Sequence, residues 1–218
     1  MRALLALVLW CWALAATAAA RTEFQARCED TIGESLSVLT GTQNGFRIDN
    51  TVGARALTAM KGRARPGRLV LGLTRTESRV SIQVGGRLLA DEASGVECIA
   101  PHIDIKLYYP PIVVYISREF RPGSCAYEEV LAHEMRHLNA YLDYLPKAEA
   151  RVRLALARRF EDKPLYARIG QAQSLLQREI DRGWMPYIKS EMAKVEALQA
   201  AIDSPCLLYT SDAADEED

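Results

Sequence analysis

The sequence has no excess of charge of either sign. Among its 218 residues, 27 are basic and 28 are acidic, which gives a net charge of -1. Proteins that bind nucleic acid need a basic surface, so this balance argues against nucleic acid as the main partner. Basic residues do gather at 61–68, KGRARPGR, but the glycines and the proline there are more typical of a solvated loop. Internal repeats are also lacking, and with 49% hydrophobic residues we expect one domain with an appendage.

The first 20 residues predict a secretory signal peptide. One arginine precedes an apolar run that ends in three alanines, and cleavage is expected after Ala20. A membrane anchor over residues 3–20 is the alternative, but the run thins into alanine and threonine at its end. No cysteine follows closely enough to indicate a lipoprotein. We therefore expect an exported protein, periplasmic or secreted, without a stable membrane anchor after cleavage.

The last residues, 206–218, are expected not to belong to the natural protein. The letters CLLYTSDAADE resemble the translation of a sequencing adapter, and the natural chain is expected to continue differently after Pro205. Without the two ends, the cysteines are Cys28, Cys98 and Cys125. In an oxidising compartment one disulfide is expected, with its pairing open. Zinc ligation by Cys125 is the less favoured alternative.

Strand and helix patterns predict an α+β fold. Residues 68–120 contain five or six short apolar or alternating runs, which indicate a mainly antiparallel sheet. A helix is then expected from Ser124, as its N-cap, to Leu145, with Pro146 as its end and a second helix over 148–160. Two amphipathic segments follow and predict a C-terminal helical hairpin. The expected organisation is an α+β domain over 21–162 and a hairpin extension over 163–205.

The chain holds only three histidines, and two of them form the pattern H-E-x-x-H: His133, Glu134, Met135, Arg136 and His137. A spacing of four residues puts both imidazoles on one face of a helix, where they can bind one metal ion. The apolar stripe of the same helix points to the other side: Tyr127, Leu131, Met135, Leu138, Leu142 and Leu145. Both imidazoles are therefore expected to be free for a metal.

Strands followed by a helix with this motif resemble the zincin metallopeptidases, over roughly 103–160. The stretch CAYEEVLAHEMRH is also similar to exported bacterial proteins classed as zincins whose function is unknown. The resemblance implies that His133 and His137 bind zinc, and that Glu134 is the general base toward a water on the metal. It also implies a peptide or protein substrate, aligned along a strand for which 112–117 is the candidate.

The third zinc ligand is open. The metzincin pattern requires a glycine and a final histidine, where this sequence has Ala140 and Asp143. Asp143 would point about 120° away from His137 if the helix continues. The gluzincin pattern takes a glutamate from a following helix, for which Glu149 is the nearest candidate. Weaker candidates are Glu161, Glu179 and His102, and either Tyr141 or Tyr144 is a candidate oxyanion donor.

Two other classes of function compete with a peptidase. A zincin-like domain without catalysis could serve as a metal-dependent binding or envelope interaction protein, although the intact Glu134 argues against this. A purely structural protein, whose helical hairpin contacts a partner, would bind no metal.

Overall fold

The structure is a computed structural model that describes residues 21–32, 36–62 and 68–204. The expected signal peptide and the adapter-like tail lie outside the described residues, as does most of the basic run at 61–68. The α+β class is confirmed. In chain order the elements are α1 (Glu23–Ile32), β1 (Leu36–Gln43), β2 (Phe46–Asp49), α2 (Ala54–Lys61), β3 (Gly72–Arg75), β4 (Arg79–Asp91), β5 (Val96–Tyr109), β6 (Ile112–Ile116), α3 (Cys125–Phe160), β7 (Leu165–Arg168), α4 (Ala172–Glu179), the π-helical turn η1 (Ile180–Trp184), α5 (Met185–Ala193) and α6 (Val195–Ile202).

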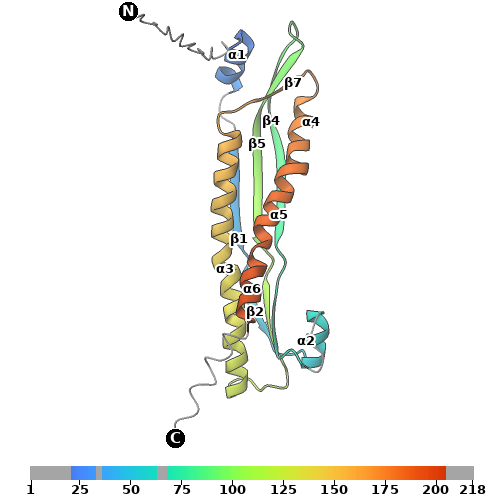
Figure 1. The fold of residues 1–218 in the computed structure, drawn as a ribbon, viewed down its shortest axis with the longest axis vertical. Helices are drawn as coiled ribbons and strands as arrows, with labels where there is room; N and C mark the ends of the chain where they lie inside the picture. The colour runs from blue at the N-terminus through green and yellow to red at the C-terminus, as the bar shows by residue number, and fades with distance from the viewer. Residues whose placement is uncertain (1–20, 33–35, 63–67, 205–218) are drawn as a thin grey trace, which may run out of the picture.

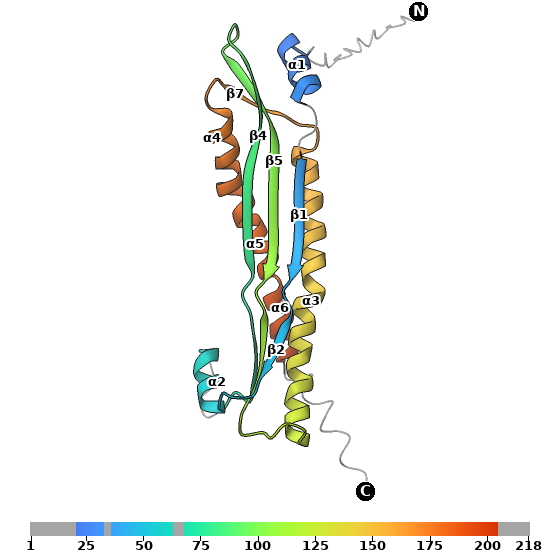
Figure 2. The same ribbon diagram turned by 180° about the vertical axis from the view of Figure 1, so that it is seen from behind.

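The strands form two sheets that follow one another along the molecule (Figures 1 and 2). The first has the order β1-β5-β4, with β7 also paired to β5, and the second has the order β2-β6-β3. Two pairings are parallel, β1 with β5 and β2 with β6, and three are antiparallel, so both sheets are mixed. Alternation in the sequence marks strands but not their directions, which is why parallel pairs were not foreseen.

Alternation along β5 decides which face of the first sheet is covered. Ile103, Ile105 and Leu107 are fully buried, whereas His102 and Lys106 are exposed. Side chains of a strand alternate between the two faces, so one face carries the core and the other lies in solvent. The helices that cover the buried face and share its core are α3 and the returning helices α4, α5 and α6.

The helix α3 does not end at Pro146, contrary to the sequence prediction. It runs unbroken for 36 residues and contains Pro146. A proline has no N–H to donate to the carbonyl four residues earlier, here that of Leu142. Gln43 supplies the missing bond, since its Nε2 donates to the Leu142 carbonyl at 2.9 Å. The predicted N-cap is confirmed: the Ser124 side chain accepts a bond from the Tyr127 N–H.

A C-terminal helical hairpin is present: after α3 the chain turns back, and residues 172–202 run antiparallel along it (Figure 1). The turn η1 separates α4 from α5, and Pro186 lies in the first turn of α5. Polar pairs between α3 and residues 172–202 confirm the antiparallel direction, because the residue number falls on α3 as it rises on the returning segment. The pairs are Arg159 with Glu179, Tyr144 with the Glu191 carbonyl, and His137 with Gln199. The last of these pairs leads to the candidate site.

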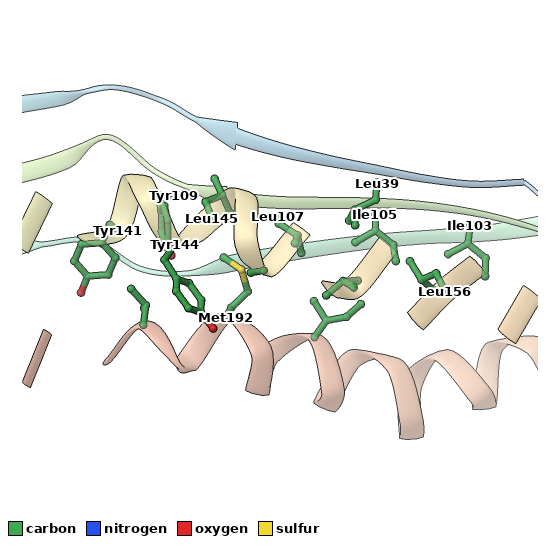
Figure 3. Packing of buried hydrophobic residues seen from close by; sticks show 14 of the residues in the cluster. Leu39, Ile103, Ile105, Leu107, Tyr109, Tyr141, Tyr144, Leu145, Leu156 and Met192 are labelled. Carbon is green, nitrogen blue, oxygen red and sulfur yellow. The ribbon is translucent and has the colours of Figure 1, made fainter. Parts of the chain in front are cut away.

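One hydrophobic core joins the sheet, α3 and the returning helices (Figure 3). Leu107 and Tyr109 come from the sheet, Leu145 and Leu156 from α3, and Met192 from α5. No described helix has the length and apolar character that a membrane span requires.

A disulfide joins α1 to the first sheet. Cys28 and Cys98 are bonded and fully buried, and Cys125 is free and exposed. Phe24 and Ala100 complete a small second core around the bond. The pairing left open by the sequence is therefore Cys28 with Cys98.

Candidate metal centre

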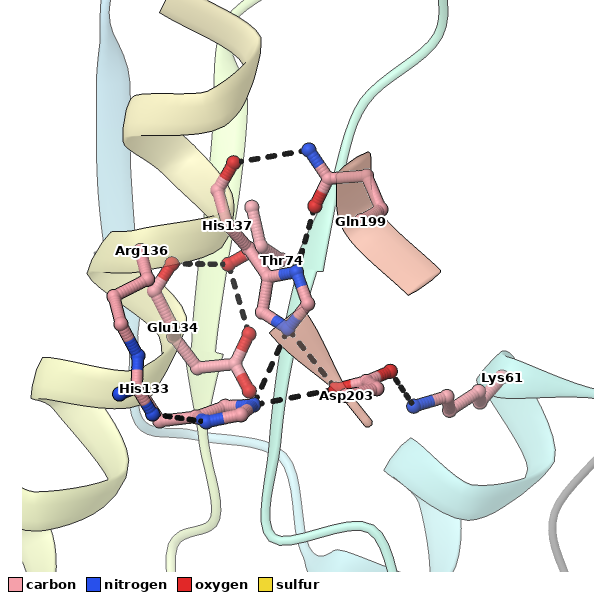
Figure 4. A network of polar contacts seen from close by, with 8 residues as sticks. All are labelled: Lys61, Thr74, His133, Glu134, Arg136, His137, Gln199 and Asp203. Atoms are coloured by element: carbon pink, nitrogen blue, oxygen red, sulfur yellow. Dashed lines mark hydrogen bonds and ion pairs between the residues drawn. The ribbon is translucent and has the colours of Figure 1, made fainter. Parts of the chain in front are cut away.

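Four elements meet around the H-E-x-x-H motif (Figure 4). The helix α3 carries His133, Glu134 and His137, whose ligand atoms lie within 4.8 Å of one another and could hold a metal ion. The strand β3 approaches from one side with Thr74. The helix α6 and the residue after it bring Gln199 and Asp203, and α2 brings Lys61, which pairs with Asp203.

Three ligand atoms form a nearly equilateral triangle. The two histidine Nε2 atoms are 3.2 Å apart, and Asp203 Oδ1 lies 3.3 Å from that of His133 and 3.1 Å from that of His137. For a tetrahedral zinc ion with bonds of about 2.0 Å, ligand atoms would be about 3.3 Å apart. The triangle therefore fits three corners of a zinc tetrahedron and leaves one corner for a further ligand.

Gln199 fixes the tautomer of His137. The His137 Nδ1 atom lies 2.6 Å from Gln199 Oε1, while Gln199 Nε2 donates to the His137 carbonyl at 3.1 Å. An amide oxygen only accepts, so Nδ1 carries the proton and the Nε2 lone pair is free. A partner of this kind on the second nitrogen is a regular feature of metal-binding histidines.

His133 is in the opposite tautomer. Arg136 lies with its Nη2 2.8 Å from His133 Nδ1, and a guanidinium only donates. The neutral His133 ring therefore carries its proton on Nε2. That single proton can be donated to His137 or to Asp203, and as long as the His137 ring is neutral the 3.1 Å contact between His137 Nε2 and Asp203 Oδ1 joins two lone pairs. A cation at the centre of the triangle would satisfy all three atoms once the His133 proton moves to Nδ1, which requires Arg136 to leave that atom.

Glu134 is held against β3. The Thr74 hydroxyl donates to Glu134 Oε2 at 2.8 Å and lies 3.0 Å from its backbone carbonyl. Gly72 makes this approach possible, because a Cβ there would lie 2.6 Å from Glu134 Oε1 and 2.7 Å from Val130 Cγ1. Burial raises the pKa of Glu134, although Thr74 and both imidazoles favour the charged form. A carboxylate with a raised pKa next to a metal site suits proton transfer.

Asp203 is kept ionised by Lys61 of α2. Burial opposes the charge on Asp203, but the hydrogen bond and the charge of Lys61, 3.1 Å from Oδ2, outweigh it and lower the pKa of Asp203. Lys61 uses the oxygen that does not face the histidines, so both oxygens of the carboxylate have a partner.

The structure does not bring Glu149 to the histidines. With Pro146 inside α3, Glu149 lies twelve residues beyond His137 on the same helix, or about 18 Å along its axis. It pairs there with Arg153 at 2.6 Å and packs against Gly41 of β1. The third candidate ligand at the triangle is Asp203 instead.

The other candidates lie elsewhere. Asp143 is exposed on α3, and His102 is on the open face of the first sheet, opposite α3. The remaining two acids lie at the far end of the helical hairpin: Glu161 caps the end of α3, and Glu179 pairs with Arg159.

The two tyrosines differ in their surroundings. The Tyr144 hydroxyl donates to the Glu191 carbonyl and accepts from Arg151, so it is occupied by packing contacts. Tyr141 is one helical turn beyond His137, is buried, and packs edge-on against Tyr109. Burial raises the pKa of Tyr141, which keeps its hydroxyl protonated and able to donate.

Asp203, Gln199, Thr74 and Lys61 were not foreseen as site residues. Asp203 and Gln199 are more than 60 residues from the histidines in sequence, and only the antiparallel run of residues 172–202 along an unbroken α3 brings them back. A signal for Asp203 was present, since it is an acid directly after the last amphipathic segment. Comparison of the chain with protein families, with characterised proteins and with solved structures finds no match.

Proposed function

We propose that this chain is an exported zinc metallopeptidase of zincin type. The observation that carries the proposal is the triangle of His133 Nε2, His137 Nε2 and Asp203 Oδ1, with sides of 3.1–3.3 Å, beside the carboxylate of Glu134. Two imidazoles and one carboxylate with an open fourth position form a donor set typical of catalytic zinc.

In this proposal each residue of the site has a separate role in metal binding or catalysis. His133, His137 and Asp203 would hold the metal, which when bound lowers the pKa of a coordinated water and polarises a carbonyl group. Glu134 accepts a proton and later returns it to the departing amine, and its raised pKa fits both steps. Thr74 holds the Glu134 carboxylate toward β3, and Tyr141 is the candidate donor to the developing oxyanion.

The strand β3 is the best candidate to align a peptide. In the second sheet β6 is central, paired with β2 on one side and β3 on the other, so the expected role of 112–117 is corrected. In the described part of the chain β3 pairs with β6 alone, so its second edge has no strand partner and is the candidate to pair with an extended peptide. Thr74 of this strand contacts Glu134, so a peptide on that edge would pass close to the general base.

Export is supported by the disulfide. Cys28 and Cys98 form a bond buried at the junction of α1 and β5, and such bonds persist in oxidising compartments. The signal peptide remains an expectation from the sequence.

The test uses the purified protein and three variants. Elemental analysis should give about one zinc per chain, reduced in Asp203→Asn. The protein should cleave a mixed peptide library, Glu134→Gln should bind zinc without cleaving, and Glu129→Gln, an exposed carboxylate on the same helix, should behave like the unaltered protein. Absence of zinc refutes the metal site, and equal cleavage by Glu134→Gln refutes the assigned mechanism.

A metal-binding protein without catalysis is the second candidate. The observation in its favour is that Glu134 is only 4% exposed and already accepts a bond from Thr74, as a structural carboxylate would. Stoichiometric zinc together with no cleavage by the unaltered protein would favour this function.

A further inference from the structure

The helix α6 is held in place by contacts at the candidate metal centre more than by packing in the hydrophobic core. Val195 is its only buried side chain, and Leu198 is 44% exposed. The preceding helix α5 is held far better, because Ile188 and Met192 are buried and the carboxylate of Glu191 pairs with Arg151 at 2.8 Å. The chain between the two helices departs from regular α-helix at Lys194.

Most polar contacts of α6 with the rest of the protein are made at the metal centre. Gln199 exchanges two hydrogen bonds with His137, one to the ring and one to the backbone carbonyl. Asp203, at the C-terminal end of α6, touches both imidazoles and Lys61. Removing these contacts would leave Val195 and the half-buried Ile202 to hold the helix.

We propose that α6 is a metal-dependent clasp, which closes on α3 when the metal binds and completes the site as it closes. This rests on the proposed metal centre. Asp203 supplies the third ligand, and Gln199 is a positioning residue that acts through His137, because it holds the proton on Nδ1 and keeps Nε2 free. Without the metal and with His137 neutral, the lone pairs of His137 and Asp203 oppose each other at 3.1 Å, so the closed position is less favourable than it is with the metal bound.

Metal binding and closure of α6 are therefore linked, and each favours the other to the same extent. If opening of α6 releases the metal, zinc at about 100 times its dissociation constant should slow the opening-dependent amide exchange of α6 about 100-fold. The helix α4, remote from the site and anchored by Ala172 and Leu176, should not change.

The experiment measures hydrogen exchange of the purified protein with and without zinc, and zinc binding by titration in the same samples. We expect protection to rise at residues 195–203 and to stay constant in α4. Binding of zinc without any change in α6 overturns the clasp but leaves the metal centre. Absence of binding refutes the metal centre itself and the clasp with it.

Two substitutions of Gln199 separate positioning from packing. Gln199→Leu keeps the size but removes the acceptor, and Gln199→Glu restores an acceptor for His137 Nδ1. With Co²⁺ as a spectroscopic probe, Gln199→Leu should alter the visible absorption of the bound ion and weaken binding about 10–100-fold, and Gln199→Glu should recover both. Identical spectra and affinities in both variants would contradict the positioning role.

Discussion

Removing the guanidinium of Arg136 should strengthen metal binding, although Arg136 lies inside the motif. To bind a metal through Nε2, His133 must carry its proton on Nδ1, and the 2.8 Å bond from Arg136 to that atom must be given up. Hydrogen bonds that involve a charged group contribute about 1.5–3 kcal/mol when shielded, and less at an exposed side chain such as that of Arg136. A cost of about 0.5–1 kcal/mol corresponds to a gain of about 2–5-fold in zinc affinity for Arg136→Gln.

Competition of the protein with a chromophoric chelator measures this gain. Arg158→Gln is the matched control, since it removes the same charge from an exposed position near the other end of α3. An effect of total charge would appear equally in both variants, whereas release of His133 Nδ1 appears only in Arg136→Gln. An unchanged or lower affinity of Arg136→Gln relative to this control would refute the tautomer argument.

Three further variants test the fold and the site. Replacing Cys28 and Cys98 by serine opens a loop with a sequence separation of 70, which should lower the free energy of unfolding by about 4 kcal/mol and the Tm by about 8–16 °C. Gln43→Ala leaves the carbonyl freed by Pro146 without its donor, and urea unfolding should show a loss of about 0.5–1.5 kcal/mol. Gly72→Ala puts a methyl group into the Glu134 side chain, and should lower kcat of the proposed peptidase about 100-fold while zinc is still bound.

Each of these predictions has its own control. Cys125→Ser should leave the Tm unchanged because that cysteine is exposed and free, and an equal loss there would contradict the role of the disulfide. Gln43→Ala should be nearly neutral in a Pro146→Ala background, because alanine supplies the missing N–H; a full loss would show that Gln43 acts otherwise. For Gly72→Ala, unaltered kcat would mean that Glu134 tolerates displacement, and loss of zinc would mean that α3 itself has moved.

The sequence predicted the part of the site that is local to one helix. A spacing of four positions between two histidines gives a fixed separation on any α-helix, and the serine before the first turn is a direct N-cap signal. Both features depend on a few neighbouring residues, so no knowledge of the fold was needed to find His133, Glu134 and His137.

The third candidate ligand, Asp203, was not predictable because of Pro146. A proline normally ends a helix. If α3 had ended at Leu145, a second helix would have followed, and it could have placed Glu149 near the histidines. The side chain that keeps α3 intact is Gln43, about a hundred positions earlier, and no local pattern reveals that contact. Once α3 is continuous, Glu149 moves about 18 Å away and residues 172–202 can run back along α3 to Asp203.

An unbroken α3 also limits how the site can move. His133 and Phe160 lie on the same straight helix, about 40 Å apart along its axis, and Phe160 is fully buried against Trp184. Tilting α3 to widen the metal end would pull Phe160 out of that contact at the opposite end. If the site binds a peptide as proposed, the opening that admits it would therefore come from movement of α6 or β3, while the two histidines stay in place.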